Sequence, residues 1–439
     1  MAMATTMTTP RTLGEVNCRV LCAEDAAALE RAVRSGVAYP PIRACAPQVI
    51  QATDSASAST RGGAEGGDGE VQEERTRGWR LQMPWIRKEQ VRPEPLPNKG
   101  PLSWHPRLPM LATRGKEHDV IVHDLRECRE TGTAPTPVVL CNEYQRGVRS
   151  IAWRPCAGKQ IAVACDTGVC LWKFGKAPIP GFPGFAQVKE DPEAAWMVFI
   201  DLDKPASTLS WSPDGKHLAV AHECSTVLQI WDVSTRAASP VKASHKDKVL
   251  MLLWSPCGKY LWTGCCNGVF YVWDTFTWTH KKWSNPQANI LDASWGPDGK
   301  AVVVCFYGRI PAVAVYLSGR SGVLVAHVLP VEMPGLVEES GTSPGSCLVE
   351  AVAWDGTGER LVAVMGRDHS RAGEIAIYSA KAAPVLNLSL IGFLKPQAKR
   401  LSPASERSAL EFLRRSSSGS LVAHGFGGTL DVFPLIFSS

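Results

Sequence analysis

The 439-residue sequence predicts an all-β protein that folds as a closed ring of seven blades, a β-propeller. Two signals support this prediction. A short phrase that begins with an aromatic residue recurs along the chain, and each copy is followed by a second apolar run that ends in an aromatic residue or histidine. Short β-rich runs at even spacing, with turn residues between them, are typical of antiparallel all-β folds.

The opening phrase starts with tryptophan in six copies, and the seventh copy is degenerate. Successive copies lie 41 to 59 residues apart. The shortest spacings match the length of one four-stranded blade, about 40–45 residues, and the longer ones leave room for loop insertions. The opening aromatic residues are Trp104, Trp153, Trp211, Trp254, Trp295, Trp354 and Phe412.

A turn follows the opening phrase, and an apolar run follows the turn. The clearest copy has Pro213, Asp214 and Gly215 before the apolar run at 217–221. Proline sets φ, and glycine takes the positive φ that other residues avoid. This turn chemistry separates the first two predicted strands of the blade.

The second apolar run ends 19 to 24 residues after each opening aromatic residue. Two of these ends carry the Trp-Asp pair that is typical of WD repeats. The fold class is therefore predicted as a seven-bladed WD40-type β-propeller over residues 100–437, with a short, partly disordered N-terminal extension. The seven ends are at His123, Trp172, Trp231, Trp273, Tyr316, Tyr378 and Phe433.

One blade carries nearly the whole set of polar residues expected inside a WD blade. His245, Thr263, Asn267 and Trp273 stand where His, Ser/Thr, Asp and Trp form a buried hydrogen-bonded set, with Asn267 in the place of Asp. Buried polar groups need such partners because an unpaired one costs several kcal/mol. We therefore predict a structural role, not a catalytic one. The same structural role is predicted for Trp153, Trp172, Trp211, Trp231, Trp254, Trp295 and Trp354.

The last blade lacks one predicted strand, because only three runs are found before Ser439. Residues 15–21 alternate apolar and polar side chains, which fits a half-buried strand. We expect this segment to supply the outer strand of the last blade and to protect its open edge. Residues 1–14 before it are expected to be flexible.

Residues 22–99 are predicted to hold a short helix at 24–34 and a mobile linker. A segment at 74–95 mixes cations with aromatic residues, including Trp79, Trp85 and Arg87. Two interpretations are open: a docking segment for a partner or an anionic surface, or a linker whose apolar residues pack on the propeller. The second is preferred.

Two further features are open to a structural or a functional interpretation. Trp278 and Trp283 lie on alternate faces of a predicted outer strand at 278–283, so one of the two is a candidate for an exposed anchor for a partner. Core packing is the default for both. The run Arg414–Ser417 resembles a basophilic kinase site around Ser416 and Ser417, where phosphorylation would add charge. A role in a blade turn is the preferred interpretation.

Several classes of function are not expected. No nucleophile elbow, zinc-protease motif or phosphate loop occurs, so the protein is predicted to be no enzyme, with no cofactor and no small-molecule substrate. The 14 cysteines include no Cys-x-x-Cys pair, which favours buried thiols over a metal site or disulfides. A net charge of +5 without a long basic block predicts no direct nucleic-acid binding. No run reaches the roughly 18 apolar residues of a transmembrane helix.

The middle of the chain is more specific than a generic WD repeat. Residues 151–165, 230–235, 272–283 and 354–365 together resemble the aladin family of WD-repeat nucleoporins. The resemblance extends over roughly residues 100–437. It implies a non-enzymatic scaffold or docking subunit of the nuclear pore complex, at the nuclear envelope, that supports nucleocytoplasmic transport of protein and mRNA. It also implies other nucleoporins as partners, including an integral membrane nucleoporin of the pore.

An adaptor of another complex is the alternative. WD-repeat rings serve many assemblies, so a substrate receptor of a ubiquitin ligase or an RNA-processing scaffold also fits the repeats. A closed, rigid ring with short edges is a good docking platform in either case. The residues alone therefore predict protein docking, and the pore assignment depends on the resemblance.

Overall fold

A computed structural model of the chain describes residues 14–16, 19–21 and most of 101–436. The predicted helix at 24–34, the basic-aromatic segment at 74–95 and the possible phosphorylation site at 414–417 lie outside the described residues. The gaps within the propeller are at 116–117, 126–136, 175–194, 203, 223–224, 243–247, 267, 285–287, 309, 321–322, 337–346, 383–384, 397–407, 414–418 and 427–428.

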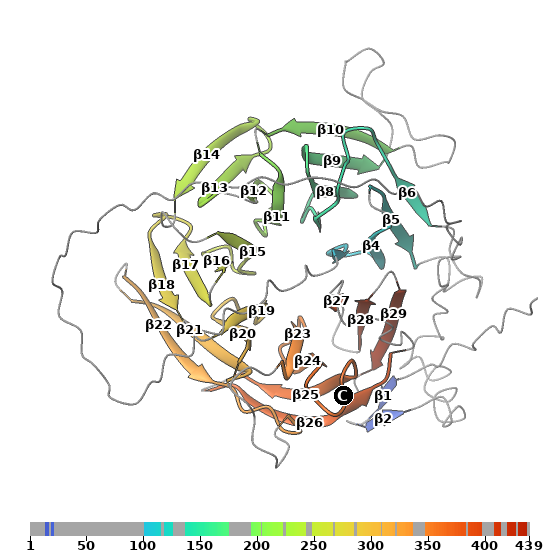
Figure 1. Cartoon of the computed structure of the whole chain (residues 1–439), viewed down its shortest axis with the longest axis vertical. Coiled ribbons are helices and arrows are strands. Elements are labelled where there is room, and N and C mark those ends of the chain that lie inside the picture. Colours follow the sequence, from blue (N-terminus) through green and yellow to red (C-terminus); the bar gives the residue numbers. More distant parts are fainter. Residues whose placement is uncertain are drawn as a thin grey trace, which may run out of the picture. The chain divides into compact units, whose positions relative to one another are not determined.

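Seven antiparallel sheets follow one another along the described part of the propeller and stand in a ring (Figure 1). Six have four strands and the last has three, counted over the described residues. Within each sheet, strands that follow one another in the chain are hydrogen-bonded neighbours. This arrangement is a seven-bladed β-propeller, so the predicted fold class is confirmed.

The blades are built from strands β3 to β29, with the first strand of each blade innermost (Figure 1). Blades 1 and 2 comprise β3 (Leu102–Trp104), β4 (Met110–Arg114), β5 (Val120–Asp124) and β6 (Val138–Leu140), then β7 (Ser150–Trp153), β8 (Gln160–Cys165), β9 (Gly168–Phe174) and β10 (Ala195–Asp201). Blades 3 and 4 comprise β11 (Ala206–Trp211), β12 (His217–His222), β13 (Val227–Asp232) and β14 (Ala237–Lys242), then β15 (Val249–Trp254), β16 (Tyr260–Cys265), β17 (Val269–Asp274) and β18 (His280–Ser284).

The last three blades follow the same order. Blades 5 and 6 comprise β19 (Asn289–Trp295), β20 (Ala301–Tyr307), β21 (Ala312–Arg320) and β22 (Val323–Pro330), then β23 (Val349–Trp354), β24 (Arg360–Met365), β25 (Ile375–Lys381) and β26 (Asn387–Leu394). Blade 7 comprises β27 (Ala409–Leu413), β28 (Gly419–Phe426) and β29 (Thr429–Ile436).

The opening tryptophan of each repeat is the last residue of an innermost strand. In blade 3, for example, Trp211 ends β11 and pairs with Leu218 of β12. The Pro213–Gly215 turn joins these two strands, and Gly215 has φ +70°. The recurring phrase therefore marks the first hairpin of each blade. In blade 7 Phe412 takes the corresponding place, next to the end of β27.

The apolar core lies between neighbouring blades. Trp211, Leu218 and Val220 of blade 3 pack with Ala162 and Ala164 of blade 2, and all five are buried. Complete burial of a large apolar side chain stabilises a fold by about 1.5–3 kcal/mol. The small alanines of blade 2 face the large residues of blade 3, so the two sheets approach closely.

Buried indole groups add hydrogen bonds between successive blades. In three cases the indole N–H donates to a backbone carbonyl of the preceding blade, one residue before that blade's own opening tryptophan. These bonds run from Trp153 to Ser103 (3.1 Å), from Trp211 to Ala152 (3.2 Å) and from Trp295 to Leu253 (3.0 Å). The opening tryptophans thus set the register of the ring as well as filling its core.

The ring is closed by the innermost strands of the first and last blades. Glu411 Oε2 accepts a hydrogen bond from Trp104 N (2.9 Å), and the Glu411 carbonyl accepts one from the Trp104 indole (3.2 Å). Leu111 of blade 1 and Leu413 and Ala423 of blade 7 complete a buried cluster with Trp104. We call this contact between β3 and β27 the seam.

The expected role of residues 15–21 needs a correction. Two short strands, β1 (Gly14–Val16) and β2 (Arg19–Leu21), pair with each other instead of forming one strand of the last sheet. β1 lies beside β29 and β2 beside β26 (Figure 1), but neither is hydrogen-bonded into those sheets. A period of two fits one long strand and two short antiparallel strands equally well, so the pattern did not distinguish them.

The turns after the opening phrases touch from blade to blade. Arg154 Nε donates to the Gly215 carbonyl (2.7 Å), and His105 Nε2 donates to the Gly158 carbonyl (3.1 Å). A side-chain carbon at Gly215 would overlap the carbonyl oxygen of Pro155, whereas one at Gly158 would meet no atom within 4 Å. Both glycines have positive φ, +70° and +66°.

Candidate functional site

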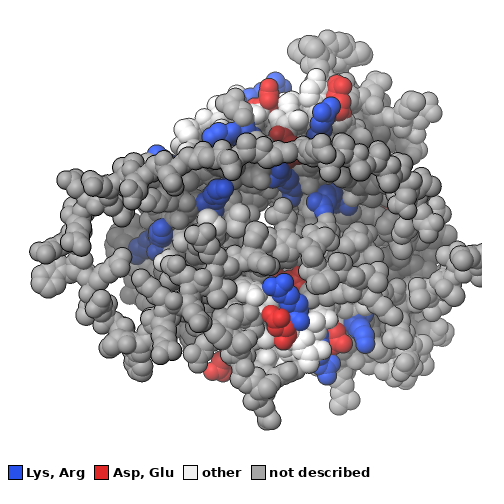
Figure 2. Space-filling view, in the orientation of Figure 1, with Lys and Arg blue, Asp and Glu red and all other residues white. Residues whose placement is uncertain are grey.

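Charged side chains are interspersed on the described part of the face in Figure 2, where Lys and Arg stand among Asp and Glu. In the described residues, no group of three or more His, Cys, Asp or Glu is placed to hold a metal ion. No helix of that part of the chain is long and apolar enough to cross a membrane. A hollow does occur between blades 3 and 4.

The predicted polar set of blade 4 is only partly within the described chain. The Trp273 indole donates to Thr263 Oγ1 (3.2 Å), and both side chains are fully enclosed. His245 and Asn267 lie outside the described residues. The Thr263 hydroxyl gives the buried indole the partner that burial demands.

In blade 2 the buried indole of Trp172 has a different hydrogen-bond partner, Gln145, which the repeat pattern did not reveal. Gln145, fully buried in the connection between blades 1 and 2, accepts from the Trp172 indole (2.7 Å). Its amide group donates to the carbonyls of His118 (2.7 Å) and Leu140 (2.9 Å). One glutamine thus ties the two blades and a loop together.

Substitution of Gln145 by leucine is expected to lower the free energy of unfolding by about 2–3 kcal/mol, because a buried indole N–H and two carbonyls lose their partner. Denaturant titration of the full chain measures this loss. Gln229→Leu is the control: it removes the acceptor of the half-buried Trp231 indole (3.0 Å), where water can replace it. Equal losses in the two variants would contradict the prediction.

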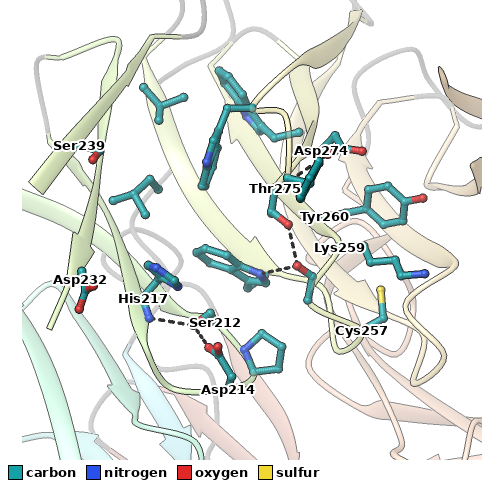
Figure 3. A pocket seen from close by; sticks show the side chains of 18 of the residues that line it. Ser212, Asp214, His217, Asp232, Ser239, Cys257, Lys259, Tyr260, Asp274 and Thr275 are labelled. Carbon is teal, nitrogen blue, oxygen red and sulfur yellow. Dashed lines mark hydrogen bonds between the residues drawn. The ribbon is translucent and has the colours of Figure 1, made fainter. Parts of the chain in front are cut away.

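The hollow is a groove of about 1290 Å³ between blades 3 and 4 (Figure 3). It is bounded by the first-hairpin turns of both blades, by the β13–β14 and β17–β18 turns, and by β14. Ile230, Val241 and Trp254 contribute apolar lining, and Ser212, Ser239 and other polar residues stand around them. The groove thus combines an apolar surface with polar groups, as binding sites commonly do.

Three rings form a row along the groove. His217 stacks on Trp254 with ring centroids 6.4 Å apart and planes at 17°, and Trp278 meets Trp254 edge-on at 6.2 Å. The Trp254 indole donates to the Gly258 carbonyl (3.3 Å). Phe276 also lines the groove and is 95% exposed. Such an exposed aromatic side chain beside a row of fixed rings is typical of a contact surface for another molecule.

The β17–β18 turn is held in one shape by Asp274, the last residue of β17. Asp274 Oδ1 accepts from the backbone N–H groups of Phe276 (2.9 Å) and Thr277 (3.0 Å), and its carbonyl accepts from Trp278 N (2.8 Å). Trp278 has φ +55°, in the left-handed region that a bulky residue seldom adopts. Strained residues that the surroundings hold in place cluster at functional sites.

Three carboxylates line the same groove. Hydrogen bonds from Ser234 and Thr235 lower the pKa of Asp232 to about 2. Burial raises the pKa of Asp214, but hydrogen bonds from Ser212 and Lys216 outweigh it, so the net shift is downward. Both side chains are therefore ionised at neutral pH, and Asp274 stands across the groove from them (Figure 3).

The residues predicted to contact a partner differ in where the structure places them. Trp278 lines the groove, whereas Trp283 of β18 is half-buried and stacks on Phe270 (5.4 Å) in the core between blades 4 and 5. Trp79, Trp85 and Arg87 lie outside the described residues. The exposed Phe276 was missed, because a phenylalanine two residues after a Trp-Asp pair carries no signal of its exposure.

The ring of seven antiparallel blades, several of them joined by the indole hydrogen bonds of their opening tryptophans, defines a WD-repeat β-propeller protein. A model of the WD domain, G-beta repeat, family matches residues 239–274. The solved β-propeller domain of Cps50 (Swd1) from Myceliophteria thermophila is similar, with a TM-score of 0.51 and 15% identity over 76% of this chain and 96% of that domain.

One relative is similar over most of its length. Aladin of Arabidopsis thaliana is 32% identical over 359 residues, which cover 77% of this chain and 76% of that protein. WD repeat-containing protein 19 of Mus musculus is 32% identical over only 75 residues, 17% of this chain and 6% of that protein. The chain belongs to the aladin family.

Proposed function

We propose that this protein is a docking subunit of the nuclear pore complex at the nuclear envelope. It catalyses no reaction and supports the transport of protein and mRNA between nucleus and cytoplasm. Its partners are other nucleoporins, including an integral membrane nucleoporin that anchors it to the pore.

Membership in the aladin family carries this proposal. The similarity extends over 359 residues, far beyond a single repeat, so it includes features that generic WD proteins lack. The fold is consistent with docking, since a closed ring with short protected edges presents a rigid surface to several partners. The groove between blades 3 and 4 adds a place where such a partner can be held.

Localisation tests the proposal directly. A fluorescently tagged full chain, expressed in eukaryotic cells, is expected to give a punctate nuclear rim that coincides with a pore marker. The tag alone serves as the control. A diffuse cytosolic signal without a rim would overturn the pore assignment.

Affinity purification separates the pore role from the adaptor alternative. The proposal expects nucleoporins, with a membrane nucleoporin among them, to be enriched over the tag-only control. Enrichment of ubiquitin-ligase or splicing subunits without pore proteins would instead support an adaptor of another complex.

A further inference from the structure

We propose that the groove between blades 3 and 4 binds an extended peptide segment of a partner protein through an arginine side chain. This inference concerns the chemistry of one site and does not depend on the pore assignment. It is based on three observations: carboxylates on both sides of the groove, a row of aromatic rings in its lining, and an exposed phenylalanine in the same lining.

The carboxylates are placed to receive a cation. Asp214 and Asp232 lie with His217 on the blade-3 side, and Asp274 lies on the blade-4 side (Figure 3). In each of the three, Oδ1 accepts the hydrogen bonds that hold its own turn. Within the described residues, the other oxygen of each carboxylate accepts no hydrogen bond. A guest donor therefore finds acceptors that the turns have already fixed in position.

Two lysines line the groove together with the three carboxylates. Lys259 extends away from the side that holds Asp214 and Asp232 (Figure 3), and Lys242 is exposed at the end of β14. Arg154, Lys216 and His217 also attract Asp214 electrostatically, and His217 attracts Asp232. Within the described residues, none of these side chains is hydrogen-bonded to the second oxygen of either carboxylate. The blade-3 carboxylates therefore keep an open acceptor for a guest. They also disfavour a nucleic acid, because its phosphates would meet ionised carboxylates.

The aromatic residues favour arginine over lysine. A guanidinium group stacks flat on an aromatic face and pairs with a carboxylate through two parallel N–H groups, which an ammonium group cannot do. The chain itself uses this contact elsewhere: Arg154 lies over Trp211 (5.2 Å) and Arg371 over Phe393 (4.4 Å). Trp278 and the exposed Phe276 present faces of the same kind to an incoming side chain.

Peptide selection on the full chain tests the proposal. A phage library of random linear peptides is panned on the immobilised protein, and the enriched peptides are labelled and titrated by fluorescence polarisation. We expect an arginine in the enriched sequences, and a loss of affinity of about ten-fold when that arginine is changed to lysine or citrulline, as for a binding hot spot. Failure to enrich arginine, or equal binding of the lysine and citrulline peptides, would overturn the proposal.

Matched variants locate the site. Asp214→Asn is compared with Asp298→Asn, because both aspartates cap the same Pro-Asp-Gly-Lys turn but only Asp214 lines the groove. Phe276→Ser is compared with Leu329→Ser, an exposed apolar residue of β22 in blade 5. The groove variants are expected to weaken binding about three- to ten-fold and the controls to leave it unchanged.

Two other outcomes would contradict binding of an arginine peptide in the groove. Equal weakening by Asp214→Asn and Asp298→Asn would place the peptide elsewhere on the ring. Tighter binding of a single-stranded oligonucleotide than of the arginine peptide, lost in Phe276→Ser, would assign the groove to nucleic acid. None of these results bears on localisation at the pore, so the two proposals fail separately.

Discussion

Replacement of Trp104 by alanine is expected to lower the free energy of unfolding by about 3–5 kcal/mol, the usual cost of removing a buried tryptophan. Trp104 is 4% exposed and lies at the seam, where its backbone N–H and its indole both donate to Glu411. The two strands of the seam lie at opposite ends of the propeller sequence, 307 residues apart at this bond. The variant therefore loses both core packing and the bonds that close the ring. Denaturant titration measures the loss.

A second measurement distinguishes an opened ring from general destabilisation. Trp211→Ala removes a similarly buried indole between blades 2 and 3, which the chain itself connects. Hydrogen exchange in β27 is therefore expected to accelerate more in Trp104→Ala than in Trp211→Ala. Equal exchange in β27 for the two variants would show that the seam is no weaker than the other blade contacts.

Replacement of Gly215 by alanine is expected to destabilise the protein by about 2–5 kcal/mol. The left-handed backbone costs a residue with a Cβ about 1–2 kcal/mol, and the forced contact with the Pro155 carbonyl adds about 1–3 kcal/mol. Because the clashing atom belongs to the backbone of blade 2, it has no rotamer by which to move aside. The melting temperature and denaturant midpoint report the change.

Gly158→Ala is the matched control for this prediction. Its φ of +66° is almost that of Gly215, but a Cβ there meets no atom within 4 Å. Only the backbone term remains, so a loss of about 1–2 kcal/mol is expected. Equal losses at the two positions would mean that the blade-to-blade contact of the turns contributes nothing.

The blades were predictable because their signals are local. Each tryptophan phrase and its turn lie within about ten residues. Trp211, Pro213 and Gly215 therefore predict a hairpin from the local sequence alone. The pairing of residues 14–21 was not predictable, because an alternating pattern does not identify the strand with which a segment pairs. The choice depends on β29 and β26, which lie at the other end of the sequence, at Thr429–Ile436 and Asn387–Leu394.

The candidate site was predictable only in part. Trp278 was singled out because one face of its predicted outer strand points outward. It lies before β18, in the turn, and lines the groove. Phe276 and Asp214 gave no such signal, since their roles arise only when the turns of blades 3 and 4 are brought together. Gln145 was missed for the same reason: its partner Trp172 belongs to the next blade, 27 residues later.

The seam also has a consequence for synthesis. Its two hydrogen-bonded residues are separated by 307 positions, and ribosomes add roughly 5–20 residues per second. The apolar face of blade 1 is therefore made about 15–60 s before its partner in blade 7 exists. During that time Trp104 and Leu111 are a target for chaperones. A chain cut short before β27 is expected to keep that face exposed and to be removed by quality control instead of forming a smaller ring.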